Sequence, residues 1–263
     1  MTIIHAIILA IIEGLTEFLP ISSTAHMKMV DFLIGIPETP FRNMYEVVIQ
    51  FAAILAVVLL YWKKFFDFKN INFYVKLLIA VIPALVFGAM LKKHIDAALS
   101  NLMFIAIVMI VGGIILLFVD KLFTKNKIQS EQQIDITTAF KIGCFQVLSI
   151  VFPGLSRSAA TIVGGMSIGL TRKVAAEFSF FLAVPTMFAA SAKSMLDVYQ
   201  EGEYAFVSAD IFTLLIGCVI SFIVAFLAVK FFIEILQKFG FKFFGFYRII
   251  LGSIILILLL IHK

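Results

Sequence analysis

The sequence predicts an all-α polytopic membrane protein, built as an inverted-topology repeat with two re-entrant, broken helical segments that meet at an active site. Of the 263 residues, 62% are hydrophobic and only 14% are charged, whereas about a quarter of the residues are charged in soluble proteins. Apolar runs recur at the length of about 20 residues that a helix needs to cross a hydrocarbon core about 30 Å thick. A membrane β-barrel would instead show short alternating segments.

The expected helices follow the apolar runs along the chain. The first covers residues 2–17 and ends before Pro20, because proline lacks an amide proton and disfavours helix in the residue before it. A short second helix, capped by Ser22 or Ser23, runs to Leu33. The later segments cover 46–62, 73–91, 101–119, 137–152, 158–170, 174–192, 210–233 and 243–262. Residues 1–263 are therefore expected to form a single integral membrane domain.

Each half of the chain contains one proline break that follows an apolar helix. Non-helical backbone is tolerated at membrane depth only where it is buried in protein or lines a wet cavity. Setting Pro20 over Pro153 pairs Glu13 with Gln146, Ser23 with Ser156 and Thr24 with Arg157. Paired broken helices are typical of inverted repeats, whose functional site lies where the two breaks meet. We therefore expect two repeats, about 1–120 and 137–263, joined by a polar linker over 121–136.

The positive charges lie mostly in the loops. Segments 63–72, 120–136 and 230–242 each carry three lysines, whereas 193–209 carries three acidic residues and one lysine. The positive-inside rule places the first three segments inside and the last one outside, although Lys92 and Lys93 then lie outside, against the rule. This distribution explains the net charge of +5 without a nucleic-acid partner. The contacts expected with the surroundings are instead those of membrane lipids.

The stretch from Glu13 to His26 places costly polar groups in this apolar sequence. A charged side chain at the bilayer centre costs about 2.5–3.5 kcal/mol on insertion scales, which predicts a functional site. Glu13 and Glu17 are four residues apart and share one helix face. They are candidates to bind a divalent metal, Mg²⁺ or Ca²⁺, or to activate a water molecule. The alternative is that one of them is protonated and only structural.

Ser22, Ser23 and Thr24 form a hydroxyl cluster at the start of a helix, where amides and the helix dipole favour phosphate. A cap alone needs one of these hydroxyls, and a serine can also attack phosphorus. His26 lies one turn after Ser23 and is a candidate general base, general acid or nucleophile. The alternative for His26 is a structural histidine.

The second break adds a permanent cation. Arg157 presents a planar fork of donors that matches phosphate oxygens. The neighbouring candidates for substrate binding are Gly154, Ser156, Ser158 and Thr161. The alternative, an arginine that extends to the membrane interface, does not require these neighbours. Together the two breaks predict phosphoryl transfer on a substrate with a lipid tail.

Two motifs resemble the signatures of a known family. Residues 13–26, Glu-Gly-Leu-Thr-Glu-Phe-Leu-Pro-Ile-Ser-Ser-Thr-Ala-His, and residues 153–161, Pro-Gly-Leu-Ser-Arg-Ser-Ala-Ala-Thr, are similar to those of the bacterial undecaprenyl-pyrophosphate phosphatases, or bacitracin-resistance proteins. The resemblance extends over nearly the whole chain, including Glu46–Gln50, Gly143–Gln146 and Glu177–Pro185.

The resemblance implies a multi-pass enzyme of the bacterial plasma membrane whose active site opens to the outer face. It implies that the enzyme removes the terminal phosphate of undecaprenyl pyrophosphate, so that the monophosphate carrier is reused in peptidoglycan synthesis, and that it uses a divalent cation. Carried onto this chain, the essential set is Glu13, Glu17, Ser23, His26 and Arg157. Water, Ser23 and His26 all stay open as the nucleophile.

The main alternative function is a lipid-carrier flippase or a secondary transporter, because transporters also use paired broken helices. A structural membrane subunit would leave the polar cluster unexplained. The sequence leaves open the choice of metal, the preferred prenyl chain length, a homo-oligomeric state and a coupling of hydrolysis to lipid movement.

Overall fold

The computed structural model describes residues 1–124, 126–201 and 207–261. It contains, in chain order, α1 (Ile3–Thr16), α2 (Ser23–Ile34), α3 (Pro40–Leu60), α4 (Trp62–Phe65), α5 (Ile71–Met90), α6 (Lys92–Leu99), α7 (Leu102–Leu122), the 3₁₀ turn η1 (Glu131–Gln133), α8 (Ile136–Val151), α9 (Arg157–Ser167), α10 (Arg172–Glu201), α11 (Ser208–Phe239) and α12 (Lys242–Ile261). These ranges contain no β-strand, only an isolated bridge between Ile128 and Leu170. The all-α prediction is confirmed.

Among the described residues, six helices are long and apolar enough to cross a membrane: α3, α5, α7, α10, α11 and α12. The prediction of a multi-pass membrane protein is therefore confirmed. The helices next to the two proline breaks are shorter, with 14 residues in α1, 12 in α2, 16 in α8 and 11 in α9. At a rise of about 1.5 Å per residue, none of these four reaches across a core about 30 Å thick.

Three helices extend beyond their predicted ends. Helix α3 begins at Pro40 instead of residue 46, because Thr39 caps it and proline is favoured at a first helical position. Helix α10 continues to Glu201 and α11 to Phe239, because helix formation does not stop where the apolar run ends. The predicted acidic loop of 193–209 is therefore partly helical, and its Glu203 lies outside the described residues, as does Lys125 of the linker.

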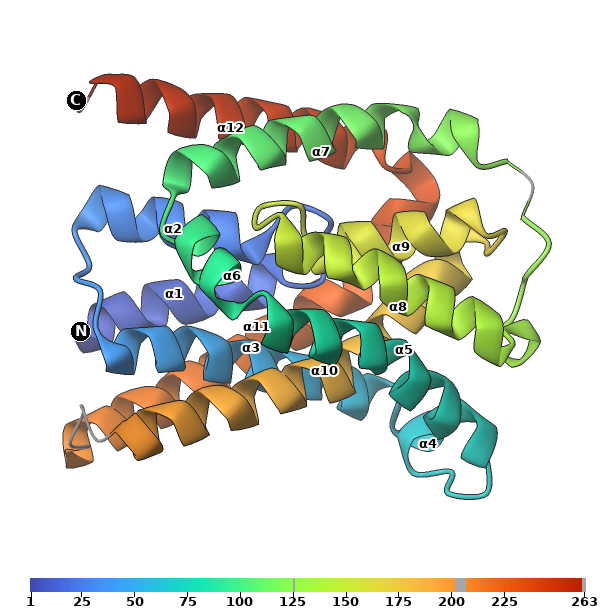
Figure 1. The fold of residues 1–263 in the computed structure, drawn as a ribbon, viewed down its shortest axis with the longest axis horizontal. Helices are drawn as coiled ribbons and strands as arrows, with labels where there is room; N and C mark the ends of the chain where they lie inside the picture. Colours follow the sequence, from blue (N-terminus) through green and yellow to red (C-terminus); the bar gives the residue numbers. More distant parts are fainter. Residues whose placement is uncertain (125, 202–206, 262–263) are drawn as a thin grey trace.

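The two pairs of short helices enter the molecule from opposite ends. Figure 1 shows α1 and α2 at the end that carries the N-terminus, and α8 and α9 at the end that carries α4 and the linker. The loop between α1 and α2 and the loop between α8 and α9 meet in the middle of the molecule, as the hydrogen bonds below demonstrate. The turn from α11 to α12 also lies at the linker end. The three lysine-rich segments therefore share one end.

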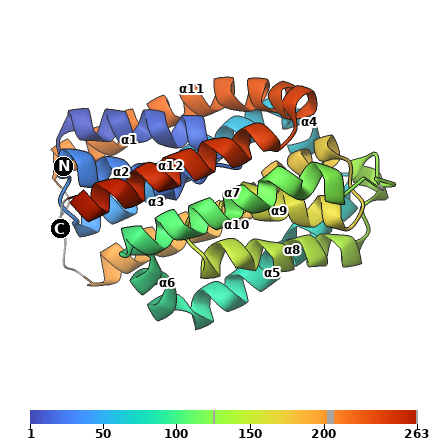
Figure 2. The same cartoon turned by 90° about the horizontal axis from the view of Figure 1, so that it is seen from above.

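The short helix before each break packs against a long helix from the other half of the chain. Helix α1 packs against α11, and α8 packs against α5, so that each short helix lies on a long helix. Helices α3 and α10 pack against each other, as do α7 and α12, which run side by side in Figures 1 and 2. A two-fold repeat with α1 related to α8 and α5 related to α11 predicts this pattern.

The contact of α1 with α11 and the contact of α8 with α5 each depend on a glycine. A Cβ atom on Gly14 of α1 would lie 2.7 Å from the carbonyl oxygen of Ser221 in α11. A Cβ atom on Gly143 of α8 would lie 2.1 Å from the carbonyl oxygen of Ala80 in α5. Small residues let helix backbones approach closely in a membrane, where van der Waals packing rather than the hydrophobic effect drives helix association. The close approach fixes the two short helices that lead into the loops.

Candidate active site

The two loops share one local geometry. Among the described residues, Ser22 and Ser156 are the only non-glycine residues with positive φ, at 72° and 76°. Each serine caps the helix that follows, because its Oγ atom accepts a hydrogen bond of 3.3 Å from the amide of Ala25 or Ala159, three residues later. Ser22 is therefore the cap of α2 and the structural counterpart of Ser156.

This correspondence corrects the predicted register of the repeat. The alignment on the two prolines placed Ser23 over Ser156 and Thr24 over Arg157, and it is wrong by one residue in the loops. One residue separates Pro20 from its cap, whereas two separate Pro153 from its cap. The structure places Ser23 and Arg157 at equivalent positions, as the first residues of α2 and α9.

The serines of the second loop hold the two loops together. The hydroxyl of Ser158 is fully buried and donates to the carbonyl oxygen of Leu19 at 2.9 Å. The Oγ atom of Ser156 lies 3.5 Å from the same oxygen and 2.9 Å from the Oγ atom of Ser158. These two predicted substrate-binding hydroxyls therefore contact the first loop, and their role toward substrate stays a prediction.

Arg248 on α12 connects both loops and was not among the predicted residues. Its guanidinium is fully buried and donates to the carbonyl oxygens of Pro20 at 3.1 Å, Leu155 at 2.7 Å and Gly154 at 2.8 Å, while its Nε atom donates to that of Met109 at 3.2 Å. These bonds satisfy the carbonyls that the broken helices leave without partners. A charged residue inside an apolar span was the signal in the sequence.

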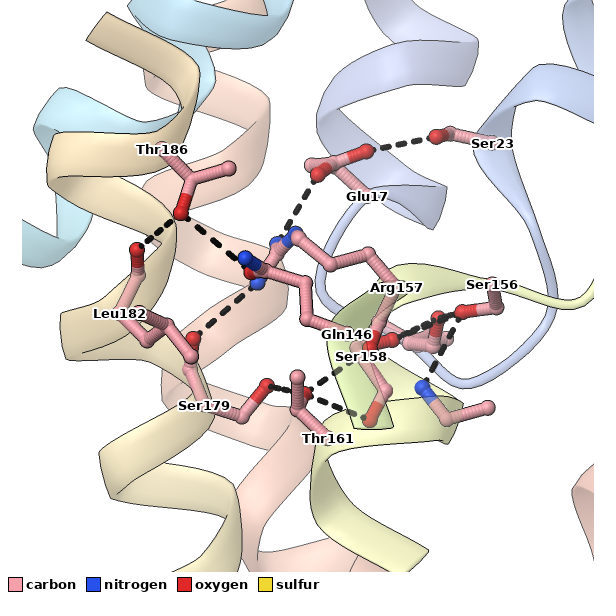
Figure 3. Close-up of polar contacts among 12 residues, drawn as sticks. Glu17, Ser23, Gln146, Ser156, Arg157, Ser158, Thr161, Ser179, Leu182 and Thr186 are labelled. Atoms are coloured by element: carbon pink, nitrogen blue, oxygen red, sulfur yellow. Dashed lines mark hydrogen bonds and ion pairs between the residues drawn. The ribbon is translucent and has the colours of Figure 1, made fainter. Parts of the chain in front are cut away.

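Glu17 lies between the two halves of the site (Figure 3). Its Oε2 atom accepts a hydrogen bond of 2.6 Å from the hydroxyl of Ser23, and its Oε1 atom forms an ion pair of 2.9 Å with Arg157. Arg157 also donates to the carbonyl oxygen of Ser179 in α10 at 3.1 Å. The structure thus brings together three of the predicted site residues, from the end of α1 and the first residues of α2 and α9.

Glu13 is the least satisfied polar group of the first half. It is fully buried, and no N–H donor contacts either of its carboxylate oxygens in the part of the chain that the structure describes. Its carboxyl contacts that of Glu17, and it also interacts electrostatically with Glu46 and Arg157. Two adjacent carboxylates fit a hard cation. The described residues contain no group of three or more His, Cys, Asp or Glu able to hold a metal.

His26 is held through both ring nitrogens. Its Nδ1 atom lies 2.7 Å from the carbonyl oxygen of Ser22, and its Nε2 atom lies 2.7 Å from the hydroxyl of Tyr247, whose ring stacks on the imidazole. Because a carbonyl only accepts, Nδ1 carries a proton, and when the ring is neutral its Nε2 atom accepts from Tyr247. The hydroxyl of Ser23 contacts Glu17 rather than His26. Tyr247 was not predicted.

The remaining predicted residues have separate surroundings. Gly154 has a φ of +98°, and a Cβ atom there would lie 2.5 Å from the carbonyl oxygen of Ile105, so the turn requires glycine. The hydroxyl of Thr161 is fully buried, 2.6 Å from that of Ser179. Thr24 is partly buried, and its side chain makes no hydrogen bond with the described residues.

A charged network that sequence reasoning missed adjoins Glu13. Arg42, which was expected in a loop, lies in α3 with its guanidinium buried between Asp31 of α2 and Glu46 of α3. Its distance to Glu46 is 2.7 Å, and Lys28 lies 4.0 Å from the other oxygen of Glu46. This network of two acids and two bases holds the C-terminal half of α2 against α3.

Comparison with known proteins assigns the chain to a family. The family model described as bacitracin resistance protein BacA matches residues 6–254. The undecaprenyl-diphosphatases of Flavobacterium psychrophilum and Flavobacterium johnsoniae are 51% and 50% identical to this chain, and each match covers 100% of this chain and 97% of the relative. The undecaprenyl-diphosphatase of Porphyromonas gingivalis is 46% identical over 99% of this chain and 98% of its own length. The chain therefore belongs to the family of the bacitracin resistance protein BacA.

Proposed function

We propose that this chain is an undecaprenyl-diphosphatase. It removes the terminal phosphate of undecaprenyl diphosphate and returns undecaprenyl phosphate to peptidoglycan synthesis, which also gives resistance to bacitracin. The relatives of that name match almost the entire chain. The observation that carries the proposal for the site is the contact of Glu17 with both Ser23 and Arg157.

The reaction begins with the hydroxyl of Ser23. Glu17 accepts the proton of this hydroxyl, with which it already forms a hydrogen bond of 2.6 Å, while the Oγ atom attacks the terminal phosphorus. The bond from phosphorus to the bridging oxygen breaks, and undecaprenyl phosphate leaves. Water then hydrolyses the phosphoserine, which releases inorganic phosphate and restores Ser23. Arg157 donates to the phosphoryl oxygens and stabilises the negative charge that develops there.

Glu13 and Glu17 are the proposed protein ligands of a divalent cation, Mg²⁺ or Ca²⁺. When bound, the cation neutralises negative charge on the diphosphate. The buried carboxyl of Glu13, which no N–H donor contacts among the described residues, supports this assignment. Arg157, which forms an ion pair with Glu17, supplies a second positive charge beside the reacting group. His26, whose Nε2 atom lies against Tyr247, orients the first turn of α2 and is not the base for Ser23 in this mechanism.

We further propose that the chain consists of two inverted repeats and that α1–α2 and α8–α9 are re-entrant hairpins in the membrane. Their entry from opposite ends in Figure 1 and the exchanged helix packing support this. The lysine-rich end is the cytoplasmic end by the positive-inside rule. The site between the loops opens to the outer face of the plasma membrane, where the diphosphate of the lipid reaches it.

Release of inorganic phosphate from undecaprenyl diphosphate by the purified full chain tests this function. The assay contains detergent and Mg²⁺ or Ca²⁺, and the Glu17→Gln variant serves as the inactive control. Proteoliposomes that carry the lipid measure transbilayer movement in parallel. Lipid movement without phosphate release would replace the enzyme by a flippase, and the absence of both would reject the proposed function.

A further inference from the structure

Gln146 occupies a position in the second half that resembles that of Glu13 in the first. Each residue lies in the short helix before a loop, seven positions ahead of the loop proline. Glu13 is fully buried, and Gln146 is 1% exposed. The two positions thus hold buried polar side chains of nearly equal size and different charge.

The amide of Gln146 has too few partners. The Oγ1 atom of Thr186 lies 3.3 Å from the Gln146 amide and 2.8 Å from the carbonyl oxygen of Leu182. A hydroxyl has one proton, and the shorter contact to Leu182 takes it. Turning the amide by 180° lets its nitrogen donate to Thr186, yet an amide nitrogen carries two N–H groups. In either orientation at least one buried N–H lacks a partner among the described residues, which costs about 1–3 kcal/mol unless a ligand accepts it.

Gln146, Arg157 and Glu13 differ in the type of group that they leave unsatisfied. Nε2 of Gln146 and Nε of Arg157 are buried donors without a partner in the described chain, whereas the oxygens of Glu13 are buried acceptors that no N–H donor contacts there. Gln146 and Arg157 both contact the face of α10 formed by Ser179, Leu182 and Thr186, and Figure 3 shows their polar ends directed toward that face. Free donors suit phosphate oxygens, and free acceptors suit a cation.

We infer that Gln146 is a phosphate-binding residue whose side-chain N–H donates to a phosphoryl oxygen of the substrate, beside Arg157. This inference rests on the proposed function and deepens it. The repeat then supplies an acceptor from Glu13 on the cation side and a donor from Gln146 on the phosphate side. The difference of one carboxylate and one amide at equivalent positions gives the bound diphosphate its orientation.

Two substitutions of similar size separate this role from a structural one. Gln146→Leu removes the donor, whereas Gln146→Glu removes the donor and adds a negative charge. If Gln146 faces phosphate, the glutamate is the worse substitution because it repels the substrate. If Gln146 serves only to bind Thr186, both substitutions remove the amide N–H, and the glutamate lowers kcat/KM no more than the leucine does. Tyr45→Phe is the matched control, because it removes a buried hydrogen bond of 2.7 Å from Tyr45 to the carbonyl oxygen of Ala6.

The experiment measures kcat/KM for phosphate release from undecaprenyl diphosphate and the thermal midpoint of each full-length variant. We expect kcat/KM to fall about 10- to 100-fold in Gln146→Leu and about tenfold further in Gln146→Glu, with kcat/KM unchanged in Tyr45→Phe. An active wild type with either variant near its activity, or with the glutamate variant at least as active as the leucine variant, would overturn the inference and leave the proposed function intact. An inactive wild type would instead reject the proposed function.

Discussion

The guanidinium of Arg248 lies 3.1 Å from the carbonyl oxygen of Pro20, although the two residues are 228 positions apart. The same side chain binds the carbonyl oxygens of Gly154 and Leu155 in the second loop. One residue of α12 therefore holds both broken helices, and Ser23 and Arg157 keep their relative positions because their loops share this anchor.

Replacing Arg248 with lysine should disrupt both loops at once. A lysine has three donors on one nitrogen and cannot reach four carbonyl oxygens that surround a planar guanidinium. Hydrogen bonds to a charged donor contribute about 1.5–3 kcal/mol each. We expect Arg248→Lys to lower the thermal midpoint by more than about 5 °C and phosphate release by more than about tenfold. Arg172→Gln, which removes a partly exposed ion pair with Asp120, is the control and should leave phosphate release unchanged.

Glu17→Gln should abolish most of the turnover while the protein stays folded. The glutamine keeps the shape of the side chain but can neither accept the proton of Ser23 nor neutralise Arg157. General-base catalysis contributes about 10²–10⁴-fold, so we expect a loss of at least about 100-fold in kcat. Glu38→Gln changes an exposed carboxylate and should leave kcat unchanged. Wild-type kcat in Glu17→Gln would remove Glu17 from the reaction.

Ser23→Ala and Tyr247→Phe should differ sharply. Ser23→Ala removes the proposed nucleophile, and acid quenching during turnover of radiolabelled substrate should trap phosphoserine in the wild type but not in this variant. Tyr247→Phe removes a hydroxyl that contacts Nε2 of His26 yet keeps the stacked ring. We expect it to lower kcat less than about tenfold. A wild type that turns over without a trapped phosphoprotein would favour direct attack by water.

Gly154→Ala should destabilise the second loop strongly. A left-handed backbone costs a non-glycine residue about 1–2 kcal/mol, and the new Cβ atom would lie 2.5 Å from the carbonyl oxygen of Ile105. We expect a loss of more than about 2 kcal/mol in unfolding free energy. Gly88→Ala in α5 is the matched control, because no atom lies within 4 Å of its added Cβ. Alanine is favoured over glycine inside a helix by about 0.5–1 kcal/mol, so stability should stay equal or rise.

Removal of divalent cations should stop phosphate release. We expect a chelator to abolish the activity and Mg²⁺ or Ca²⁺ to restore it, because a diphosphate bound beside Glu13 and Glu17 needs its charge neutralised. Glu13→Gln should raise the metal concentration for half-maximal activity at least about tenfold. Full activity of the wild type after exhaustive chelation would contradict the proposed cation.

Hydropathy and the two motifs predicted the spanning helices, both breaks and the residues Glu17, Ser23 and Arg157 that the structure brings together. The sequence signals were direct, because proline ends helices and charged groups are costly in lipid. The one-residue shift between Ser22 and Ser156 was not visible, because it depends on which serine adopts a positive φ.

The partners of the site residues could not be read from the sequence. Tyr247, Ser179 and Arg248 belong to long apolar helices, and periodicity does not specify which turn of such a helix faces a loop from another part of the chain. Arg42 was misplaced for a different reason. Thr39 and Pro40, which mark the start of α3, precede the apolar run, so the predicted helix began too late and the ion pairs of Arg42 were not predicted.

The dependence of both loops on Arg248 has a consequence for biosynthesis. The ribosome makes the chain from its N-terminus, so the loop after α1 is made long before Arg248, which binds its Pro20 carbonyl oxygen. The two loops gain their common anchor only when α12 packs beside α7. A chain interrupted before residue 242 would lack this anchor.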